Sequence, residues 1–152
     1  MKYRKIIIFF IPLIIATIWM SYKYYKYKID AALFVAAYSN DVTYAEKLIK
    51  KGANVNARHH FRYKDIQTPL LIAILEGNPE MVSFLIDHGA STDKIDSWRF
   101  FPLDLSIAIE GGRYSISSSA PRTPWATVRK KQREIIPILV KANAPSKKQM
   151  NK

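Results

Sequence analysis

The stretch that decides the fold is TPLLIAILEGNPEMVSFLIDHGA, residues 68–90. Thr68 can cap a helix whose first residue is Pro69, because the first turn of a helix does not need that N–H. Apolar residues then follow at helical spacing up to Gly77, which can take the left-handed conformation that ends a helix. A second apolar helical stretch ends in the same way at Gly89. The segment therefore predicts two short helices, each closed by a glycine.

An earlier copy of this unit lies 37 residues upstream. The residues VAA (35–37) and LIKKGA (48–53) match IAI (72–74) and LIDHGA (85–90) of the central copy. Asn40 stands where the central copy has its first glycine, and asparagine is the next most comfortable residue at positive φ. No Thr-Pro pair opens this copy, so Asp30 is expected to cap its first helix.

A third copy is interrupted in the middle. PLDLSIA (102–108) lies 33 residues after the start of the central copy, and the closing half is EIIPILVKANA at 134–144, with Asn143 in the glycine position. About 21 extra residues separate the halves, near 111–129, and their Ser, Pro and Gly content predicts a loop. Pro137 should kink or shorten the final helix.

These units resemble the ankyrin repeat. The resemblance implies an all-α solenoid of about three helix-turn-helix repeats, at 29–64, 65–97 and 98–145, which bury their apolar faces only against one another. Residues 146–152 read as a basic tail. Proteins of this family bind other proteins through turn fingers and a concave row of inner helices, so the resemblance also implies a binding module.

Residues 1–28 are predicted to be a membrane anchor. Ile6–Met20 is an unbroken apolar run, and with Ser21 and Tyr22 it gives 17 residues, about 25 Å of helix and the short end of what spans a bilayer. Aromatic and basic residues that would form an interfacial belt follow: Trp19, Tyr22, Lys23, Tyr24, Tyr25, Lys26, Tyr27 and Lys28. No pair of small residues marks a cleavage site, which favours an uncleaved signal anchor over a cleaved signal peptide.

The orientation of the anchor is nearly balanced, because three basic residues flank the apolar run on each side. Long domains translocate largely regardless of charge, and the basic N-terminal segment resembles that of an export signal. We therefore expect a single-pass protein of a bacterial inner membrane with its repeats in the periplasm. A cytoplasmic repeat domain is the alternative.

The residues expected to contact a partner lie in two fingers and the long loop. The first finger is four residues longer than the family standard and offers aromatic and basic side chains, which are common at interfaces: His59, His60, Phe61, Arg62, Tyr63 and Lys64. Asp96, Trp98 and Arg99 are the candidates of the second finger, and Arg113, Tyr114, Arg122 and Trp125 those of the loop. The alternative for the aromatic residues is packing onto the neighbouring repeat.

The composition argues against an enzyme. The chain has no cysteine and three histidines, and no third ligand is visible near His59 and His60, so no metal or other cofactor is expected. The serines at 115–119 lack the setting of a catalytic nucleophile. Half of the net charge of +12 lies in residues 1–28, and the other basic residues are interleaved with acidic ones, so nucleic-acid binding is not expected. Without a catalytic site, no small-molecule substrate is expected either.

Small anchored ankyrin proteins of this kind resemble the immunity proteins that neutralise phospholipase toxins delivered between bacteria by type VI secretion. The resemblance implies one protein partner, a lipase-type toxin whose active site the fingers and loop would block. An inhibitor tethered at the membrane under attack has a raised effective concentration there. The alternative is a scaffold or assembly factor that tethers a periplasmic enzyme or envelope complex.

Overall fold

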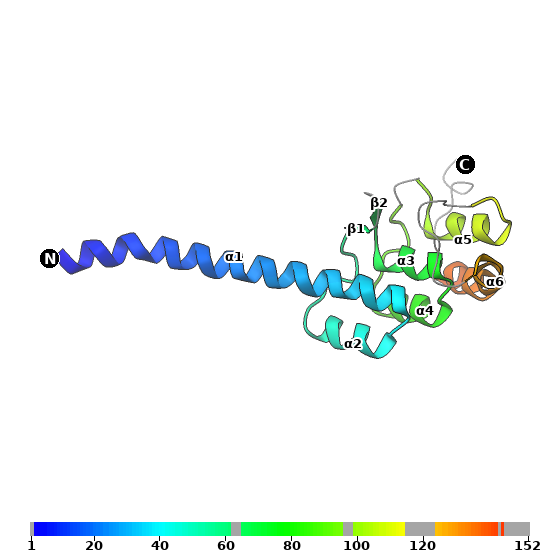
Figure 1. Cartoon of the computed structure of the whole chain (residues 1–152), viewed down its shortest axis with the longest axis horizontal. Coiled ribbons are helices and arrows are strands. Elements are labelled where there is room, and N and C mark those ends of the chain that lie inside the picture. The colour runs from blue at the N-terminus through cyan, green and yellow to red at the C-terminus, as the bar shows by residue number, and fades with distance from the viewer. Residues whose placement is uncertain (1, 62–64, 96–98, 115–123, 143, 145–152) are drawn as a thin grey trace.

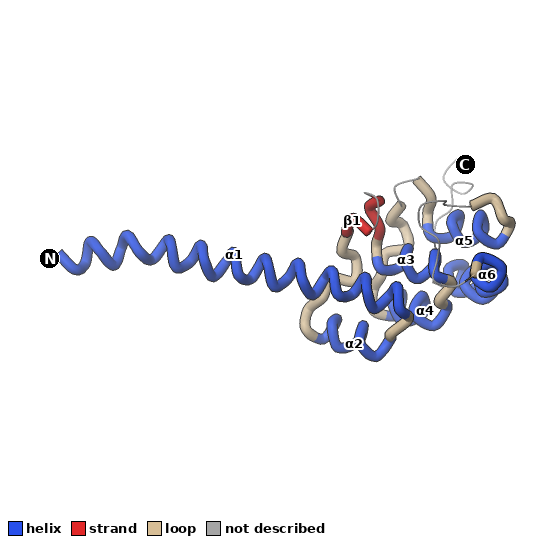
Figure 2. The backbone as a smooth tube through the Cα atoms, in the orientation of Figure 1, coloured by secondary structure: helices blue, strands red, loops and turns tan. Residues whose placement is uncertain are grey.

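The computed structural model describes residues 2–61, 65–95, 99–114, 124–142 and 144, with side chains for all of these except 2–9, 60–61 and 65–66. Within this part of the chain, six helices and one two-stranded hairpin follow one another (Figure 1). They are α1 (Lys2–Ser39), α2 (Val42–Lys50), β1 (His59–Phe61), β2 (Asp65–Gln67), α3 (Pro69–Glu76), α4 (Pro79–Asp87), α5 (Pro102–Glu110) and α6 (Trp125–Lys141). The predicted helical solenoid is confirmed, with one short hairpin added (Figure 2).

Helix α1 runs without interruption from the predicted anchor into the first repeat. Its C-terminal part buries Leu33 and Phe34 in the core, while its N-terminal part projects away from the repeats (Figure 1). The predicted boundary at 28–29 thus falls inside a helix. The prediction that Asp30 caps a helix is wrong, because Asp30 lies within α1. Its carboxylate instead accepts a hydrogen bond from the Asn54 N–H at 2.7 Å.

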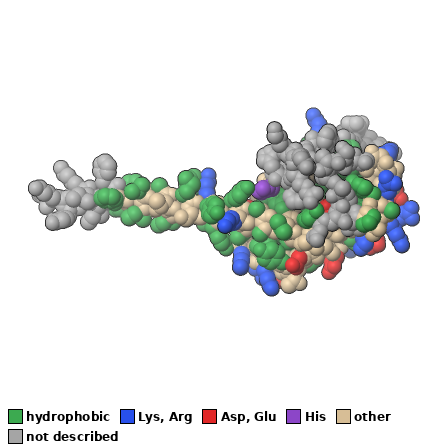
Figure 3. Space-filling view, viewed as in Figure 1, with side chains coloured by type: hydrophobic (Ala, Val, Ile, Leu, Met, Phe, Trp, Pro, Cys, Tyr) green, Lys and Arg blue, Asp and Glu red, His purple; other side chains and the backbone are tan. Residues whose placement is uncertain are grey.

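The projecting part of α1 exposes apolar and aromatic side chains (Figure 3). The large ones between Phe10 and Tyr27 are 48–64% exposed. Among the residues that the structure describes, no helix is both long enough and apolar enough to cross a membrane. The predicted span at Ile6–Met20 begins among residues whose side chains lie outside the description.

Three helix pairs form the stack: the end of α1 with α2, α3 with α4, and α5 with α6. One continuous core of aliphatic side chains runs through all three pairs. The left-handed conformation predicted at three helix ends is confirmed, because φ is 58° at Asn40, 70° at Gly77 and 83° at Gly89, while Asn143 lies outside the described residues. The predicted cap is also confirmed, since the Thr68 hydroxyl accepts a hydrogen bond from the Leu71 N–H at 3.3 Å. These local signals fix where the helices begin and end.

Helix α6 corrects the prediction for the third repeat. It spans 17 residues, whereas the outer helices α2 and α4 span nine each. The predicted loop near 111–129 is therefore too long at its C-terminal end, because the chain is helical from Trp125. Pro137 lies inside α6 and does not end it. The added helical turns cover the C-terminal end of α3, where Val128 packs beside Gly77.

A buried polar contact joins three helices at this end of the stack. Gln132 is fully buried on α6, and its amide nitrogen donates to the Ile74 carbonyl of α3 at 2.8 Å. Its amide oxygen accepts a hydrogen bond from the Ser106 hydroxyl of α5 at 2.6 Å. Since a buried amide without partners is costly, these bonds favour one register of α6 on the stack.

Candidate partner-binding surface

The first finger is a β-hairpin. Strands β1 and β2 pair antiparallel, with His59 opposite Gln67 and Phe61 opposite Asp65. Arg62, Tyr63 and Lys64, predicted to contact a partner, form the connection and lie outside the described residues. The side chains of His60 and Phe61 are also not described, although the backbone places both residues in β1. The structure therefore places the backbone of His59, His60 and Phe61 in the hairpin, and the other candidates of this finger stay a prediction.

His59 faces the long helix. Its ring lies 5.2 Å from the Tyr27 ring and 5.4 Å from the Phe34 ring, measured between centroids. Its Nε2 atom is 2.9 Å from the Tyr27 hydroxyl. These contacts hold the ring against two aromatic side chains of α1, but His59 is only half-buried, so its contact with a partner stays a prediction. His59 thus joins the first finger to α1.

Side chains at the start of the first finger join it to the segment that leads into the second finger. The Asn56 amide donates to the Gly89 carbonyl at 2.9 Å and accepts a hydrogen bond from the Ser91 N–H at 2.7 Å. The Arg58 guanidinium donates to the Ile95 carbonyl at 3.3 Å. These hydrogen bonds join the first repeat to the second, so they fix the position of one finger relative to the other.

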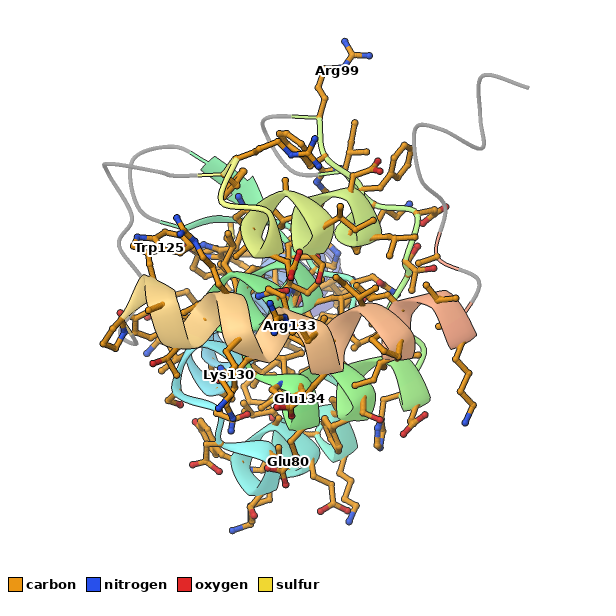
Figure 4. The ribbon with its side chains drawn as sticks, turned by 90° about the vertical axis from the view of Figure 1, so that its right-hand side faces the viewer. Glu80, Arg99, Trp125, Lys130, Arg133 and Glu134 are labelled. Carbon is orange, nitrogen blue, oxygen red and sulfur yellow. The ribbon has the colours of Figure 1, made fainter. Side chains whose placement is uncertain are left out.

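Arg99 is the described candidate of the second finger, while Asp96 and Trp98 lie outside the described residues. Its side chain is exposed and extends away from the stack (Figure 4). Its φ is 63°, and Arg99 and Asn40 are the non-glycine residues with positive φ in the described part of the chain. Such a conformation is mildly unfavourable for arginine, so the finger holds this side chain outward at some cost in stability.

The third candidate region divides into surface and core. Arg113 is exposed beside the Gly111 turn, but Tyr114 is only 6% exposed and stacks edge-on against Phe100 at 5.6 Å between ring centroids. Tyr114 was expected on an exposed loop, and that expectation is wrong because its ring completes the core beside α5. Trp125 is half-buried at the start of α6. Arg122 lies outside the described residues.

Hydrogen bonds lower the pKa values of two carboxyls in the repeat domain. The Ser91 hydroxyl donates to Asp93, and this hydrogen bond lowers the pKa of the Asp93 carboxyl despite a small opposing effect of burial. A hydrogen bond from Lys50 lowers the pKa of Glu46 on α2. Both carboxyls are therefore ionised at neutral pH. Among the described residues, no group of three His, Asp or Glu side chains could hold a metal ion.

Tyr27 and Asn56 were not among the predicted site residues. Tyr27 was assigned to the membrane belt, and the helical spacing that puts it on the same side of α1 as Asp30 and Phe34 could have shown that it meets the first repeat. Asn56 belongs to the ending typical of the repeat, where its side chain bridges neighbouring turns. Both residues position the fingers.

The family model for ankyrin repeats in three copies matches residues 33–117, and the chain belongs to the ankyrin-repeat family. Ankyrin repeats are protein-interaction modules, so the repeat domain is a protein-binding module. The matched residues include the end of α1, the first finger and helices α2 to α5, while α6 lies beyond the match.

Several proteins of different description share part of this sequence. A mitochondrial disaggregase of Bos taurus is 36% identical over 69 residues, and ankyrin repeat and SOCS box protein 2 of Homo sapiens is 35% identical over 69. Glycerophosphocholine phosphodiesterase gde1 of Schizosaccharomyces pombe is 38% identical over 68 residues. Each match covers 45% of this chain, but the chain spans only 6–10% of the length of these relatives.

Proposed function

We propose that this chain is a membrane-tethered ankyrin module that binds one protein partner through its fingers. The proposal is carried by the hydrogen bonds that hold the two fingers: Asn56 and Arg58 join the fingers to each other, and His59 joins the first finger to α1. Such a preformed surface lowers the entropic cost of binding a folded partner. The outward Arg99 supplies a side chain of a type common at binding hot spots.

The tether is the projecting part of α1. Its large apolar side chains from Phe10 to Met20 are exposed, and aromatic and basic residues follow them in the order expected at a membrane interface. A single-pass anchor in a bacterial inner membrane, with the repeats in the periplasm, accounts for this arrangement. Flotation of the full chain with native membranes after a carbonate wash tests the tether.

The partner that best suits such a module is a lipase-type toxin, and the role is immunity. The support is the resemblance to ankyrin immunity proteins that neutralise type VI phospholipase toxins, together with the physical advantage of placing an inhibitor on the membrane under attack. The fingers would bind over the mouth of the toxin active site and exclude lipid from it. The net positive charge of the chain would speed association with an acidic toxin surface.

Capture of the full-length chain from its native membrane tests this role. A tagged chain is solubilised in mild detergent, and the retained proteins are identified and titrated. A stoichiometric lipase whose activity falls to zero at one equivalent of the chain would support immunity. A housekeeping enzyme that keeps its activity when bound would instead identify a scaffold and remove the inhibitory role.

Substituting Arg99 by glycine separates binding from stability. Glycine accepts the positive φ of this position, so Arg99→Gly should change the free energy of unfolding by no more than about 1 kcal/mol. Loss of the guanidinium should weaken capture of the partner by roughly tenfold, as expected for a hot-spot arginine. Isothermal titration with the captured partner measures this effect.

The matched control is Lys130→Ala, which removes one positive charge from the exposed face of α6 (Figure 4). It should leave the affinity unchanged, because Lys130 is not on a finger. Equal weakening by both variants would show that net charge, and not the second finger, determines binding.

A further inference from the structure

One edge of the repeat domain is tied to α1 where the helix leaves its apolar segment. The loop after α2 forms the edge of the domain that faces the N-terminal end of α1 (Figure 1). The Lys26 ammonium donates to the Gly52 carbonyl, and the Asp30 carboxylate accepts the Asn54 N–H at 2.7 Å. The turn at residues 51–54, called here the α2 exit turn, is therefore held against α1 within one helical turn.

This edge carries an excess of positive charge. Its two carboxylates are already paired, Asp30 with Lys26 at 3.2 Å and Glu46 with Lys50 at 2.6 Å. Three further ammonium groups are exposed and, within the described part of the chain, have no carboxylate at ion-pair distance: Lys23, Lys28 and Lys51. Lys47 on α2 is likewise exposed and has no ion pair within the described part of the chain. The junction of α1 and the α2 exit turn therefore carries at least three uncompensated positive charges, with Lys23 and Lys28 on different sides of α1, about 140° apart.

Two of these lysines lie over aromatic rings of α1. The Lys23 ammonium is 4.1 Å from the centroid of the Trp19 ring, and the Lys28 ammonium is 5.0 Å from that of Tyr24. Aromatic rings and lysines gather where a helix passes from hydrocarbon to headgroups. The stretch from Trp19 to Lys28 is roughly 13 Å of helix, and the α2 exit turn meets α1 within it.

We propose that Lys23, Lys28 and Lys51 form a docking surface for acidic phospholipid headgroups, which holds the repeat domain down on the bilayer. The inference rests on the membrane tether proposed above and adds the lipid class and the contact residues. An acidic lipid is the occupant because two of the lysines belong to the helix that enters the membrane, and the third lies on the turn bound to that helix. Each lysine should contribute about fivefold to the docked population.

The first finger would then operate at the membrane surface. His59 of the finger is 2.9 Å from the Tyr27 hydroxyl, one residue before Lys28. A partner bound to the same leaflet would then lie within reach of this finger.

Depth-dependent quenching on the full chain tests the proposal. The chain has no cysteine, so one fluorophore can be attached at Lys50→Cys, beside the α2 exit turn, or at Thr43→Cys, about 10 Å away at the other end of the same helix. The Thr43→Cys chain also carries Lys50→Ala, so that both chains lack the ammonium group that pairs with Glu46. Each labelled chain is reconstituted in phosphatidylcholine vesicles that carry a headgroup spin label, with or without 30% phosphatidylglycerol. We expect stronger quenching at position 50 than at 43, and only with phosphatidylglycerol.

Charge reversal identifies the contact residues. Lys28→Glu with Lys51→Glu should lower the quenching at position 50 at least severalfold, whereas the matched pair Lys130→Glu with Lys131→Glu on α6 should leave it unchanged. Equal quenching at both label positions, or quenching that ignores phosphatidylglycerol, would overturn the docking surface while the tether stands. A chain that does not float with the vesicles would overturn the tether and the docking surface together. Capture of a partner that is not a lipase would affect the proposed function alone.

Discussion

Replacing Phe34 by alanine should lower the free energy of unfolding by about 3–5 kcal/mol. Phe34 is 2% exposed in α1, at the point where the helix meets both the repeat core and the His59 ring of the first finger. A terminal repeat packs against one neighbouring repeat only, so no second repeat interface compensates for the lost contacts of the phenyl ring. For a domain whose total stability is typically 5–15 kcal/mol, this loss is a large fraction.

Urea denaturation of the full chain in nonionic micelles, followed by circular dichroism, measures the effect of Phe34→Ala. The neighbouring Val35→Ala is the matched control, because Val35 is 57% exposed on the same helix and should change stability by less than about 0.5 kcal/mol. Hydrogen exchange adds a second measurement: the β1 amides should exchange faster in Phe34→Ala than in Val35→Ala. Similar destabilisation by both variants would contradict the prediction, because alanine is the best helix former and an equal loss would show that burial of Phe34 does not determine the stability of this region.

Helix ends were predictable from the sequence because their signals are local. Thr68 before Pro69, glycine at 77 and asparagine at 40 each act within one turn of backbone, and the structure places all of them as expected. The repeat spacing then determined which helices pair, since each unit must bury its apolar face against the next. No long-range information was needed for these conclusions.

The direction of individual aromatic rings was not predictable in the same way. Tyr114 and His59 both stand in irregular or short segments, where no helical period says which face is buried. Their positions depend on partners distant in sequence, Phe100 for one and Tyr27 for the other. An aromatic residue in such a segment suits a partner surface and a core equally well. Here the Tyr114 ring is buried, whereas the His59 ring is half-buried against α1.

The length of α6 escaped prediction for a related reason. The Pro-rich and Ser-rich composition of the third repeat predicts a loop, but the residues from Trp125 onward contain good helix formers that were counted with it. Val128, Gln132 and Ile135 follow at helical spacing and all are buried. The short outer helix that is standard in the family led us to expect a loop here. The extra turns of α6 make contacts with the end of α3 that a standard repeat lacks.

Because of those contacts, replacing Gly77 by any residue with a side chain should destabilise the fold. A Cβ at this position would lie 3.2 Å from the Val128 Cα and 3.3 Å from its Cγ1, and φ is 70°. Alanine at positive φ costs about 1–2 kcal/mol, and the close approach to a backbone atom of α6 adds an overpacking cost. Gly77→Ala should therefore lower the free energy of unfolding by about 2–4 kcal/mol.

Gly89→Ala separates the two causes. Its φ is 83°, but a Cβ there would meet no atom within 4 Å, so this variant should show only the backbone cost. The difference between the two unfolding free energies, measured by urea denaturation under the same conditions, then reports the packing of α6 against the end of α3. Equal losses in unfolding free energy would show that α6 can shift at Val128 to accommodate the added methyl group without loss of stability. A larger loss for Gly77→Ala would identify the added turns of α6 as a tightly packed cap on the repeat stack.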